Sequence, residues 1–387
     1  MSFMQILILG RLEKLSLAEL ESLFGEKIKK FAPSIALSSQ KDKINIDQLG
    51  GVVKIAKVID AIPFAVWSKI QQYIEKNSEK LFQYNRSRKL TFGISVYGLG
   101  INSFDVQSLG IRVKKLLRQS GKSIRFVANK DQRLTTAQVV HNHLVENGVE
   151  LIIGIGKTET LLAITTGIQN IESYSLRDYG RPNRDARVGM LPPKLAQIML
   201  NLARPKKNGK ILDPFCGTGV ILQEALLLGF DVIGSDINPR MVEYSKKNLD
   251  WLGEHFIIKN KSEVFWADAI KRTWDYSIDA VVTEGTLGLP LTPHFDPKRK
   301  IKNEADVSRL ILAFLTNLKP QLKPDTPVCL CIPAWAENDR YRMLKVVDQI
   351  MGLGYNFIRF KDIQPLDLLY FRKGQMVARQ ILVLRSN

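Results

Sequence analysis

The sequence predicts an α/β protein of more than one domain, and three observations support this fold class. The chain has 387 residues, and a compact domain usually takes about 100–200 residues. From Lys210 onward, strand-like and helix-like patterns alternate, which is typical of a doubly wound parallel sheet. Residues 211–219 join a short apolar strand to a glycine-rich turn, and such turns let the backbone approach a nucleotide-like ligand.

The chain is strongly basic, with 56 Lys+Arg against 38 Asp+Glu and a formal net charge of +18. Because Lys and Arg release counterions from a phosphate backbone, this excess favours a polyanionic partner such as nucleic acid. Residues 1–170 carry 24 basic and 14 acidic side chains, and residues 171–387 carry 32 and 24, so the charge is not confined to a basic tail. A general role in solubility is the alternative explanation.

Composition argues against several classes of protein. A hydrophobic fraction of 45% argues against wholesale disorder, and no stretch approaches the ~20 apolar residues of a membrane span. The first residues lack the pattern of a signal peptide. The cysteines are Cys216, Cys329 and Cys331, none of them in a C-x-x-C pair, and only four His are present, so no metal site is expected. We therefore expect a reduced, cytoplasmic protein.

The sequence of the N-terminal half predicts two successive α/β segments, one before and one after residue 50. A strand is expected at residues 5–9 and a helix at 16–23, with Ser16 as N-cap and Glu19 at capping-box spacing. After residue 50, β-branched runs and helical periodicity predict further elements. These are strands at 54–59, 90–96, 123–127 and 149–155, and helices at 106–119 and 136–146.

Basic side chains gather in two places. Residues 106–130 hold seven basic residues and no acidic one, and the helix within them presents its cations opposite its apolar stripe. A solvated helix face is the plain explanation, but a face of one sign favours phosphate contact. Residues 173–193 place arginines among turn-forming residues and predict an irregular linker, followed by a helix at 193–202. The candidate RNA contacts are Lys114, Lys115, Arg118, Arg125, Arg177 and Arg181.

The segment Asp-Pro-Phe-Cys-Gly-Thr-Gly at residues 213–219 is the most specific motif. The helix after it, at 220–228, ends at Gly229, and the next strand, 231–236, ends on Asp236. Asp236 lies 19 residues beyond Gly217, close to the spacing of a carboxylate that binds ribose hydroxyls. Leu222 stands where a dinucleotide fingerprint has its third glycine, which favours a cofactor without a pyrophosphate. A structural tight turn is the alternative.

This loop resembles the S-adenosylmethionine loop of class I methyltransferases. The resemblance implies that Asp213 and the loop amides hold the methionine part, that Asp236 holds the ribose and that Asp268 holds the adenine amino group. Asp268 is also plausible as an ordinary strand-end residue. The cofactor-binding residues implied are Asp213, Phe215, Gly217, Gly219, Asp236, Ile237, Asp268 and Ala269.

The fourth strand of such a sheet is expected at residues 279–284, and it ends on Glu284. Amino-directed methyltransferases usually carry Asp/Asn-Pro-Pro-Tyr there, and the acid or amide holds the target amine for attack on the methyl group. This chain has Glu284-Gly285-Thr286-Leu287 instead, so the candidate catalytic residues are Glu284, Gly285 and Leu287. A stacking ring must then come from elsewhere, and the candidates are Phe295, Trp335 and Tyr370.

The chain ends on apolar stretches at residues 366–371 and 376–384 with a turn near Gly374, which predicts a terminal β-hairpin. Nearly the full length is similar to the THUMP-domain tRNA guanine-N2 methyltransferases that modify position ten. The segments that carry this similarity are residues 8–11, 18–21, 49–55, 92–98, 177–182 and 190–196.

The family resemblance implies an N-terminal ferredoxin-like portion (1–50), a THUMP RNA-binding domain (51–170), a linker (171–190) and a Rossmann-like class I methyltransferase domain (191–387). That last domain would hold a seven-stranded, mostly parallel sheet with a terminal hairpin. The first two portions would hold the tRNA acceptor stem and deliver one guanine to the catalytic domain.

The function implied is transfer of methyl from S-adenosylmethionine to the exocyclic N2 amine of a guanine, with tRNA as partner. A protein partner subunit is compatible with the sequence and not required by it. Two alternatives stay open: a tRNA-binding protein that keeps the cofactor pocket without catalysis, and an amino-methyltransferase of another RNA or DNA base.

Overall fold

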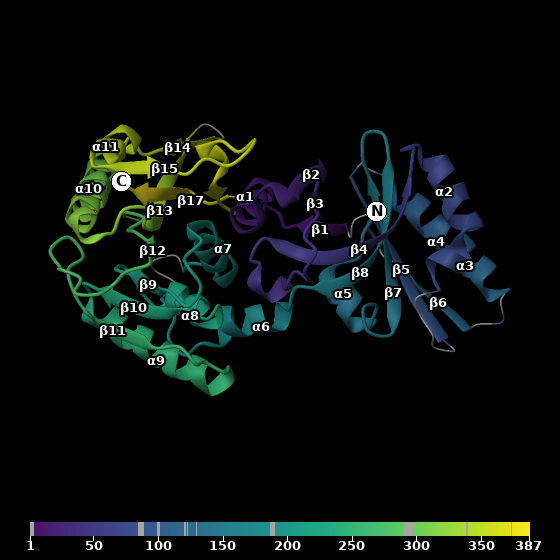
Figure 1. The fold of residues 1–387 in the computed structure, drawn as a ribbon, viewed down its shortest axis with the longest axis horizontal. Helices are drawn as coiled ribbons and strands as arrows, with labels where there is room; N and C mark the ends of the chain where they lie inside the picture. Colours follow the sequence, from purple (N-terminus) through teal and green to yellow (C-terminus); the bar gives the residue numbers. More distant parts are fainter. Residues whose placement is uncertain are drawn as a thin grey trace. The chain divides into compact units, whose positions relative to one another are not determined.

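The chain forms two compact units in the computed structural model (Figure 1). Unit 1 comprises residues 1–17, Phe24–Asp47 and Gly51–Ile171, and unit 2 comprises Ala18–Leu23, Gln48–Gly50 and Glu172–Asn387. The structure describes residues 4–83, 89–98, 101–119, 121, 123–128, 130–185, 190–289, 297–337, 340–372 and 374–387.

Unit 1 is built on one eight-stranded sheet of order β2-β3-β1-β4-β8-β7-β5-β6. The pairs of β5 with β6 and with β7 are parallel, and the other pairs are antiparallel. The strands are β1 (Gln5–Leu9), β2 (Ile28–Ala32), β3 (Ile35–Ser38), β4 (Val52–Ile62), β5 (Lys89–Tyr97), β6 (Ser123–Val127), β7 (Gly148–Ile155) and β8 (Thr160–Ile168). The predicted strands of this half are confirmed to within a few residues.

Strands from residues 1–50 and from residues 51–170 share this sheet, because β1 pairs with β4. The helices are α1 (Glu13–Phe24), α2 (Trp67–Lys76), α3 (Ser78–Leu81), α4 (Ser103–Arg118) and α5 (Thr136–His141), with short 3₁₀ turns at Gly25–Lys27 and Ile46–Gln48. The division of this half at residue 50 remains a prediction.

Helix α4 shows why its sequence folds as it does. Asn102 caps the helix by accepting a hydrogen bond from the amide of Phe104. The apolar side chains at helical spacing, Val106, Leu109 and Val113, are at most 1% exposed and pack into the unit 1 core. The predicted helix at 106–119 is therefore confirmed, and its basic side chains are left on the outer face.

Two N-terminal predictions need correction. Helix α1 begins at Glu13, so Ser16 lies inside the helix, where its hydroxyl donates to the carbonyl of Leu12 at 3.1 Å. Ser16 is therefore not an N-cap, and the proposed capping box is wrong. Helix α5 ends at His141, five residues early, because His143 adopts a left-handed conformation with φ 51°.

Unit 2 is built on a nine-stranded sheet in which seven strands follow the order β11-β10-β9-β12-β13-β17-β15. Strands β9 to β13 are parallel to one another, whereas β17 runs antiparallel to β13 and β15. The strands of the main path are β9 (Lys210–Asp213), β10 (Asp231–Asp236), β11 (Ser262–Trp266), β12 (Ala280–Glu284), β13 (Pro327–Glu337), β15 (Tyr355–Phe357) and β17 (Val377–Ser386).

Two short strands complete this sheet: β14 (Arg340–Met343) pairs with β13, and β16 (Leu369–Tyr370) pairs with β17. The predicted terminal hairpin is the β16–β17 pair. The helices of unit 2 are α6 (Ile171–Ser175), which begins at the boundary between the units, α7 (Pro193–Ala203), α8 (Val220–Leu227), α9 (Pro239–His255), α10 (Pro297–Leu318) and α11 (Val347–Gly352), with 3₁₀ turns at Lys319–Gln321 and Pro365–Asp367. This mixed α/β arrangement confirms the predicted fold class.

One apolar cluster packs α10 against strands of the second sheet. The buried stripe of α10, with Val307, Ile311 and Phe314, packs in the same cluster as Val281 of β12 and Leu330 of β13. Burying such side chains supplies about 25 cal/mol per Å² of apolar surface. This packing fixes β12 and β13 against α10.

The segment predicted as an irregular linker is largely helical where it is described. Helix α6 is followed directly by a π-helical turn at Leu176–Gly180. A buried ring, Tyr174, lies within it, and Tyr174 donates a hydrogen bond to Gln197 of α7. Turn-forming residues misled the prediction, because burial of one face fixes this segment as a helix.

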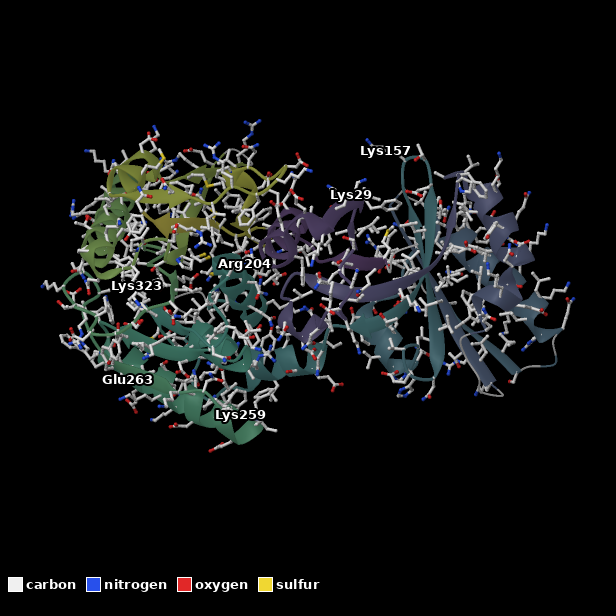
Figure 2. All side chains as sticks on the ribbon, viewed as in Figure 1. Lys29, Lys157, Arg204, Lys259, Glu263 and Lys323 are labelled. Carbon is white, nitrogen blue, oxygen red and sulfur yellow. The ribbon has the colours of Figure 1, made fainter. Side chains whose placement is uncertain are left out.

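Charged side chains cover the outside of both units, as Figure 2 shows for Lys157 at the β7–β8 turn and for Lys259 beyond α9. Among the described residues, no helix is long and apolar enough to cross a membrane.

Candidate active site

Four acidic residues mark the carboxyl ends of four neighbouring strands. Asp213 ends β9, Asp236 ends β10, Asp268 follows β11 by two residues, and Glu284 ends β12. The order β11-β10-β9-β12 places these ends side by side along one edge of the sheet. In open α/β sheets ligands bind at this edge, so the four predicted acids are brought to one site.

Asp213 is buried at the centre of this edge. One carboxylate oxygen, Oδ1, accepts hydrogen bonds from the Thr283 hydroxyl at 2.6 Å and from the Phe215 amide at 3.3 Å. Burial raises the pKa of Asp213 to about 7, although these hydrogen bonds oppose the rise. Asp213 therefore titrates close to neutral pH.

The turn after β9 needs its two glycines for different reasons. Gly217 has φ 51° and Gly219 has φ 81°, conformations that other residues rarely adopt. A Cβ at Gly219 would lie 2.4 Å from the Ser245 hydroxyl, whereas a Cβ at Gly217 would meet open space. The loop is therefore closed on the side of α9 at Gly219 and open at Gly217, where a ligand can approach its backbone.

Asp236, at the end of the neighbouring strand β10, holds this loop in place through hydrogen bonds. Its Oδ2 accepts from the Gly217 amide at 3.0 Å, and its Oδ1 accepts from the Asn238 amide at 2.8 Å. Burial raises the pKa of Asp236, and these two hydrogen bonds oppose the rise. The predicted ribose-binding acid thus also fixes the position of the predicted loop. Asn238 caps α9 as expected, since its side chain accepts from the Arg240 amide.

The ends of β10 and β11 present an aromatic side chain that sequence reasoning missed. Trp266 is 60% exposed, and its Nε1 donates to the carbonyl of Ile237 at 2.8 Å. Ile237 itself is 61% exposed, which suits a side chain that packs on a ligand. The available signal was a tryptophan at the carboxyl end of a strand, where the core no longer covers it.

The other predicted cofactor residues have different surroundings. Asp268 accepts from the Ile270 amide and lies 3.5 Å from Lys271 Nζ. Ala269 is buried in the core, and its carbonyl accepts from Asn317. Phe215 meets Phe314 of α10 edge-on, with 5.0 Å between ring centroids. Phe215 therefore also anchors the loop on the core.

Glu284 forms an ion pair with Arg379, a residue that sequence reasoning did not single out. The Nε of Arg379 donates to Oε1 of Glu284. Burial raises the pKa of Glu284, and the nearby guanidinium opposes that rise by favouring the carboxylate. The available signal was an arginine within the otherwise apolar terminal strand β17.

The residues after Glu284 extend the strand and then turn. The Gly285 amide donates to the Cys331 carbonyl at 3.1 Å, so Gly285 continues the pairing of β12 with β13. Leu287 is half-buried. Asn303 of α10 accepts from the Leu289 amide at 2.8 Å and holds the turn in place.

The three candidates for a stacking ring have different outcomes. Phe295 lies outside the described residues. Trp335 is 1% exposed in the core, so its selection is wrong. Tyr370 is half-buried on β16, opposite Arg379 of β17, and lines a pocket of about 200 Å³ together with Arg379. Tyr370 is therefore the ring placed beside the strand end.

The predicted RNA contacts on α4 and β6 lie at the surface. Lys115, Arg118 and Arg125 are exposed, and Lys114 is half-buried. Arg125 also donates to Asn142 at 3.1 Å. These four side chains remain candidates for phosphate contact.

The predicted contacts Arg177 and Arg181 need correction, because both are buried. Arg177 donates to both carboxylate oxygens of Glu224, at 2.6 and 3.1 Å, and stacks over Tyr174 at 4.5 Å. Arg181 is 2% exposed, and burial lowers its pKa. Arg177 holds this segment against α8, and Arg181 donates to the Arg177 carbonyl at 3.3 Å, so their prediction as RNA contacts is wrong.

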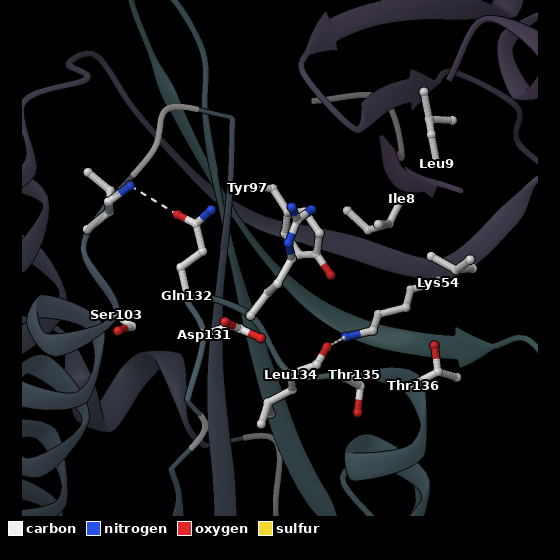
Figure 3. Close-up of a pocket in the computed structure, with 13 residues that line it drawn as sticks. Ile8, Leu9, Lys54, Tyr97, Ser103, Asp131, Gln132, Leu134, Thr135 and Thr136 are labelled. Atoms are coloured by element: carbon white, nitrogen blue, oxygen red, sulfur yellow. Dashed lines mark hydrogen bonds between the residues drawn. The ribbon is translucent and has the colours of Figure 1, made fainter. Parts of the chain in front are cut away.

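A second pocket, of about 660 Å³, lies in unit 1 and was not foreseen (Figure 3). Lys54 reaches from β4 to donate to the carbonyl of Leu134 at 2.8 Å, and it pairs with Glu150 at 2.5 Å. Arg133 lies over the ring of Tyr97 at 5.3 Å. The pocket lies where the segment before α5 meets the sheet.

The site of unit 2 fits a cofactor of the class predicted from the loop. The open space at Gly217 leaves room beside the loop backbone, and carboxylates at the next strand ends suit ribose hydroxyls and an amino group. The residues present therefore fit S-adenosylmethionine.

Two family models match the chain: an RMKL-like methyltransferase domain over residues 181–334, and a DNA methylase over residues 57–247. In structure, TrmN from Thermus thermophilus is similar over 100% of this chain and 99% of that chain, with a TM-score of 0.55 and 16% identity. At this identity the likeness shows the fold alone.

Two archaeal relatives are similar in sequence. A tRNA (guanine(10)-N2)-dimethyltransferase of Methanothermobacter thermautotrophicus is 36% identical over 149 residues, which are 38% of this chain and 40% of that protein. A probable tRNA (guanine(10)-N2)-dimethyltransferase of Methanothermococcus thermolithotrophicus is 36% identical over 117 residues, which are 30% of this chain and 72% of that protein. The chain thus matches less than half of the first relative's length.

Proposed function

The chain belongs to the tRNA (guanine(10)-N2)-dimethyltransferase family, and on that premise we propose that it transfers methyl groups from S-adenosylmethionine to the exocyclic N2 amine of a guanine in tRNA. The observation that carries the proposal is the Glu284–Arg379 pair at the end of β12, next to the glycine turn of β9. A carboxylate held at that strand end is the group that an amine substrate needs.

Methyl transfer requires the Glu284 carboxylate to be ionised and oriented toward the substrate amine. S-adenosylmethionine supplies a methyl group on a positively charged sulfur. The Glu284 carboxylate accepts a hydrogen bond from the N2 amine and so turns the nitrogen lone pair toward that methyl group. As the bond between sulfur and the methyl group gives way to the new N–C bond, Glu284 would hold the proton that N2 releases. Burial raises the pKa of Glu284 and so favours this proton, and the Arg379 guanidinium favours its later release to solvent.

The cofactor is assigned to the strand ends already described. We assign the ribose hydroxyls to Asp236, whose carboxylate lies next to the open side of the loop at Gly217. Asp213, at the centre of the sheet edge, is assigned to the methionine part, and Asp268 to the adenine amino group. Ile237 and Trp266, at the carboxyl ends of β10 and β11, provide exposed apolar surface for the cofactor.

Unit 1 is assigned to RNA binding. It carries the exposed cations of α4 and β6, and its residues 51–170 are proposed as the THUMP domain, with the catalytic domain at 191–387. A cytoplasmic location is proposed as well, because the three cysteines are free and buried, as expected in a reducing compartment.

A second function is methylation of an amine on a DNA base. The match of residues 57–247 to a DNA methylase favours it, and the strand-end logic for an amine would be the same. The basic character of the chain suits either nucleic acid.

One experiment separates these functions. Purified protein is incubated with labelled cofactor and either undermodified tRNA or duplex DNA, and the products are digested and identified as nucleosides. The proposal predicts label in N2-methylguanosine or its dimethyl form from tRNA. Label in a DNA base alone would establish the second function, and no labelled nucleoside with cofactor binding intact would overturn both.

A further inference from the structure

We propose that a pocket of unit 2, the Tyr370 pocket, receives the base of the target guanine and reads its O6–N7 edge through Arg372. The pocket has a volume of about 200 Å³, and the residues used here are Tyr179, Arg184, Met190, Tyr370, Arg372 and Arg379. This inference rests on the proposed function, because it names the substrate group recognised beside Glu284.

Strand register places the pocket at the reactive edge of the sheet. Glu284 of β12 pairs with Cys331 of β13, and Arg379 of β17 pairs with Pro333, two residues further along β13. Tyr370 of β16 pairs with Arg379 in turn. Arg379 therefore contacts Glu284 and lines the pocket at the same time, so a base held there lies beside the carboxylate.

The walls of the pocket suit a flat, aromatic ligand. Tyr179 is 62% exposed, and the guanidinium of Arg184 lies over its ring at 5.1 Å. Tyr370 and Met190 add aromatic and apolar surface. Bases extruded for chemistry are held by such stacking surfaces, which contact the faces of the ring and leave its edges to polar groups.

The polar lining favours guanine over adenine. Arg372 is exposed and forms no ion pair with a described carboxylate. Its backbone amide donates to the Gln375 side chain at 2.9 Å, and this hydrogen bond fixes the backbone at Arg372. Guanine presents two acceptors, O6 and N7, to which an arginine donates bidentately, whereas adenine presents a donor beside N7. Asp178, which also lines the pocket, supplies an acceptor for the guanine N1–H.

The test compares tRNA carrying the target guanine with the same tRNA carrying 2-aminopurine there, which keeps the amine and N7 but lacks O6 and N1–H. Wild-type protein should methylate guanine at least about 100-fold faster, because a substrate without O6 leaves polar groups of the site unpaired. Arg372→Met should slow transfer to guanine more than transfer to 2-aminopurine, which offers Arg372 only N7, and the preference should shrink about tenfold. Arg359→Met, an exposed arginine outside the pocket, is the matched control.

Equal slowing of both substrates by Arg372→Met would overturn the inference, and so would an unchanged preference. Arg372→Lys keeps the charge without the bidentate geometry and should recover only part of the preference. Cofactor affinity, measured for each variant, reports folding of unit 2. Failure of the wild-type protein to methylate tRNA would instead refute the proposed function, and the inference with it.

Discussion

The Lys54–Glu150 pair of unit 1 and the Glu284–Arg379 pair of unit 2 show how similar chemistry serves different ends. In unit 1, Lys54 and Glu150 are at most 2% exposed, and Glu150 also accepts from the hydroxyls of Ser95 and Thr165. In unit 2, the Glu284 side chain is 18% exposed at the carboxyl end of β12.

Burial of an ion pair alone therefore does not indicate function. The carboxylate of Glu150 has its acceptor positions filled from within the protein, so this pair ties the sheet to the segment before α5. Glu284 keeps an open side at the edge where ligands bind in such sheets. Accessibility and place in the topology distinguish the two.

Breaking the closed pair should give the largest effect. Lys54→Met leaves Glu150 buried without its cation and should lower the free energy of unfolding of unit 1 by about 3–5 kcal/mol. Urea denaturation measures this, with Lys57→Met, an exposed lysine on the same strand, as control. Cofactor affinity, a property of unit 2, should not change. A destabilisation as small as that of the control would mean that the pair does not stabilise unit 1.

Breaking the open pair should change the pH dependence of transfer. Arg379→Met removes the cation that opposes the rise in the pKa of Glu284, so the carboxylate protonates at higher pH. The acid limb of the rate profile should therefore move to higher pH, with a several-fold greater reduction in rate at pH 6 than at pH 8.5. Arg385→Met, at the far end of β17, is the control. An acid limb that does not move would show that Arg379 does not affect the pKa of Glu284.

Removing surface cations should give the smallest effect. The double variant Lys115→Gln and Arg118→Gln should weaken tRNA binding and lower the slope of log affinity against log salt by about 0.7–0.9 for each phosphate that is no longer neutralised. Affinities at several salt concentrations measure this slope. The control is Lys246→Gln with Lys259→Gln, two exposed lysines of unit 2. Equal slopes in the two double variants would exclude this face as the RNA footprint.

Local patterns predicted most of the fold. The strand at 231–236 and the helix beginning at Val220 follow from apolar runs, glycines and caps near them in sequence. The acids at the strand ends were also predictable from local sequence, because each lies at or just after the end of its own strand.

Contacts distant in sequence account for what was missed. Arg379 meets Glu284 across 95 residues, and Arg177 meets Glu224 across 47, so neither pairing leaves a local pattern. Arg177 shows why composition alone misleads. An arginine among turn formers suggests a surface loop, whereas a buried carboxylate on α8 holds it in the interior.

The role of Glu284 is tested by measuring methyl transfer in a single turnover by Glu284→Gln. Glu263→Gln serves as control, because this exposed acid lies near the amino end of β11, away from the carboxyl strand ends of the site, and accepts a hydrogen bond from the Tyr276 hydroxyl. We predict a reduction of about 100-fold or more in the transfer rate with tRNA and cofactor affinities unchanged. A rate within about threefold of wild type would contradict the assignment of Glu284 to the reacting amine.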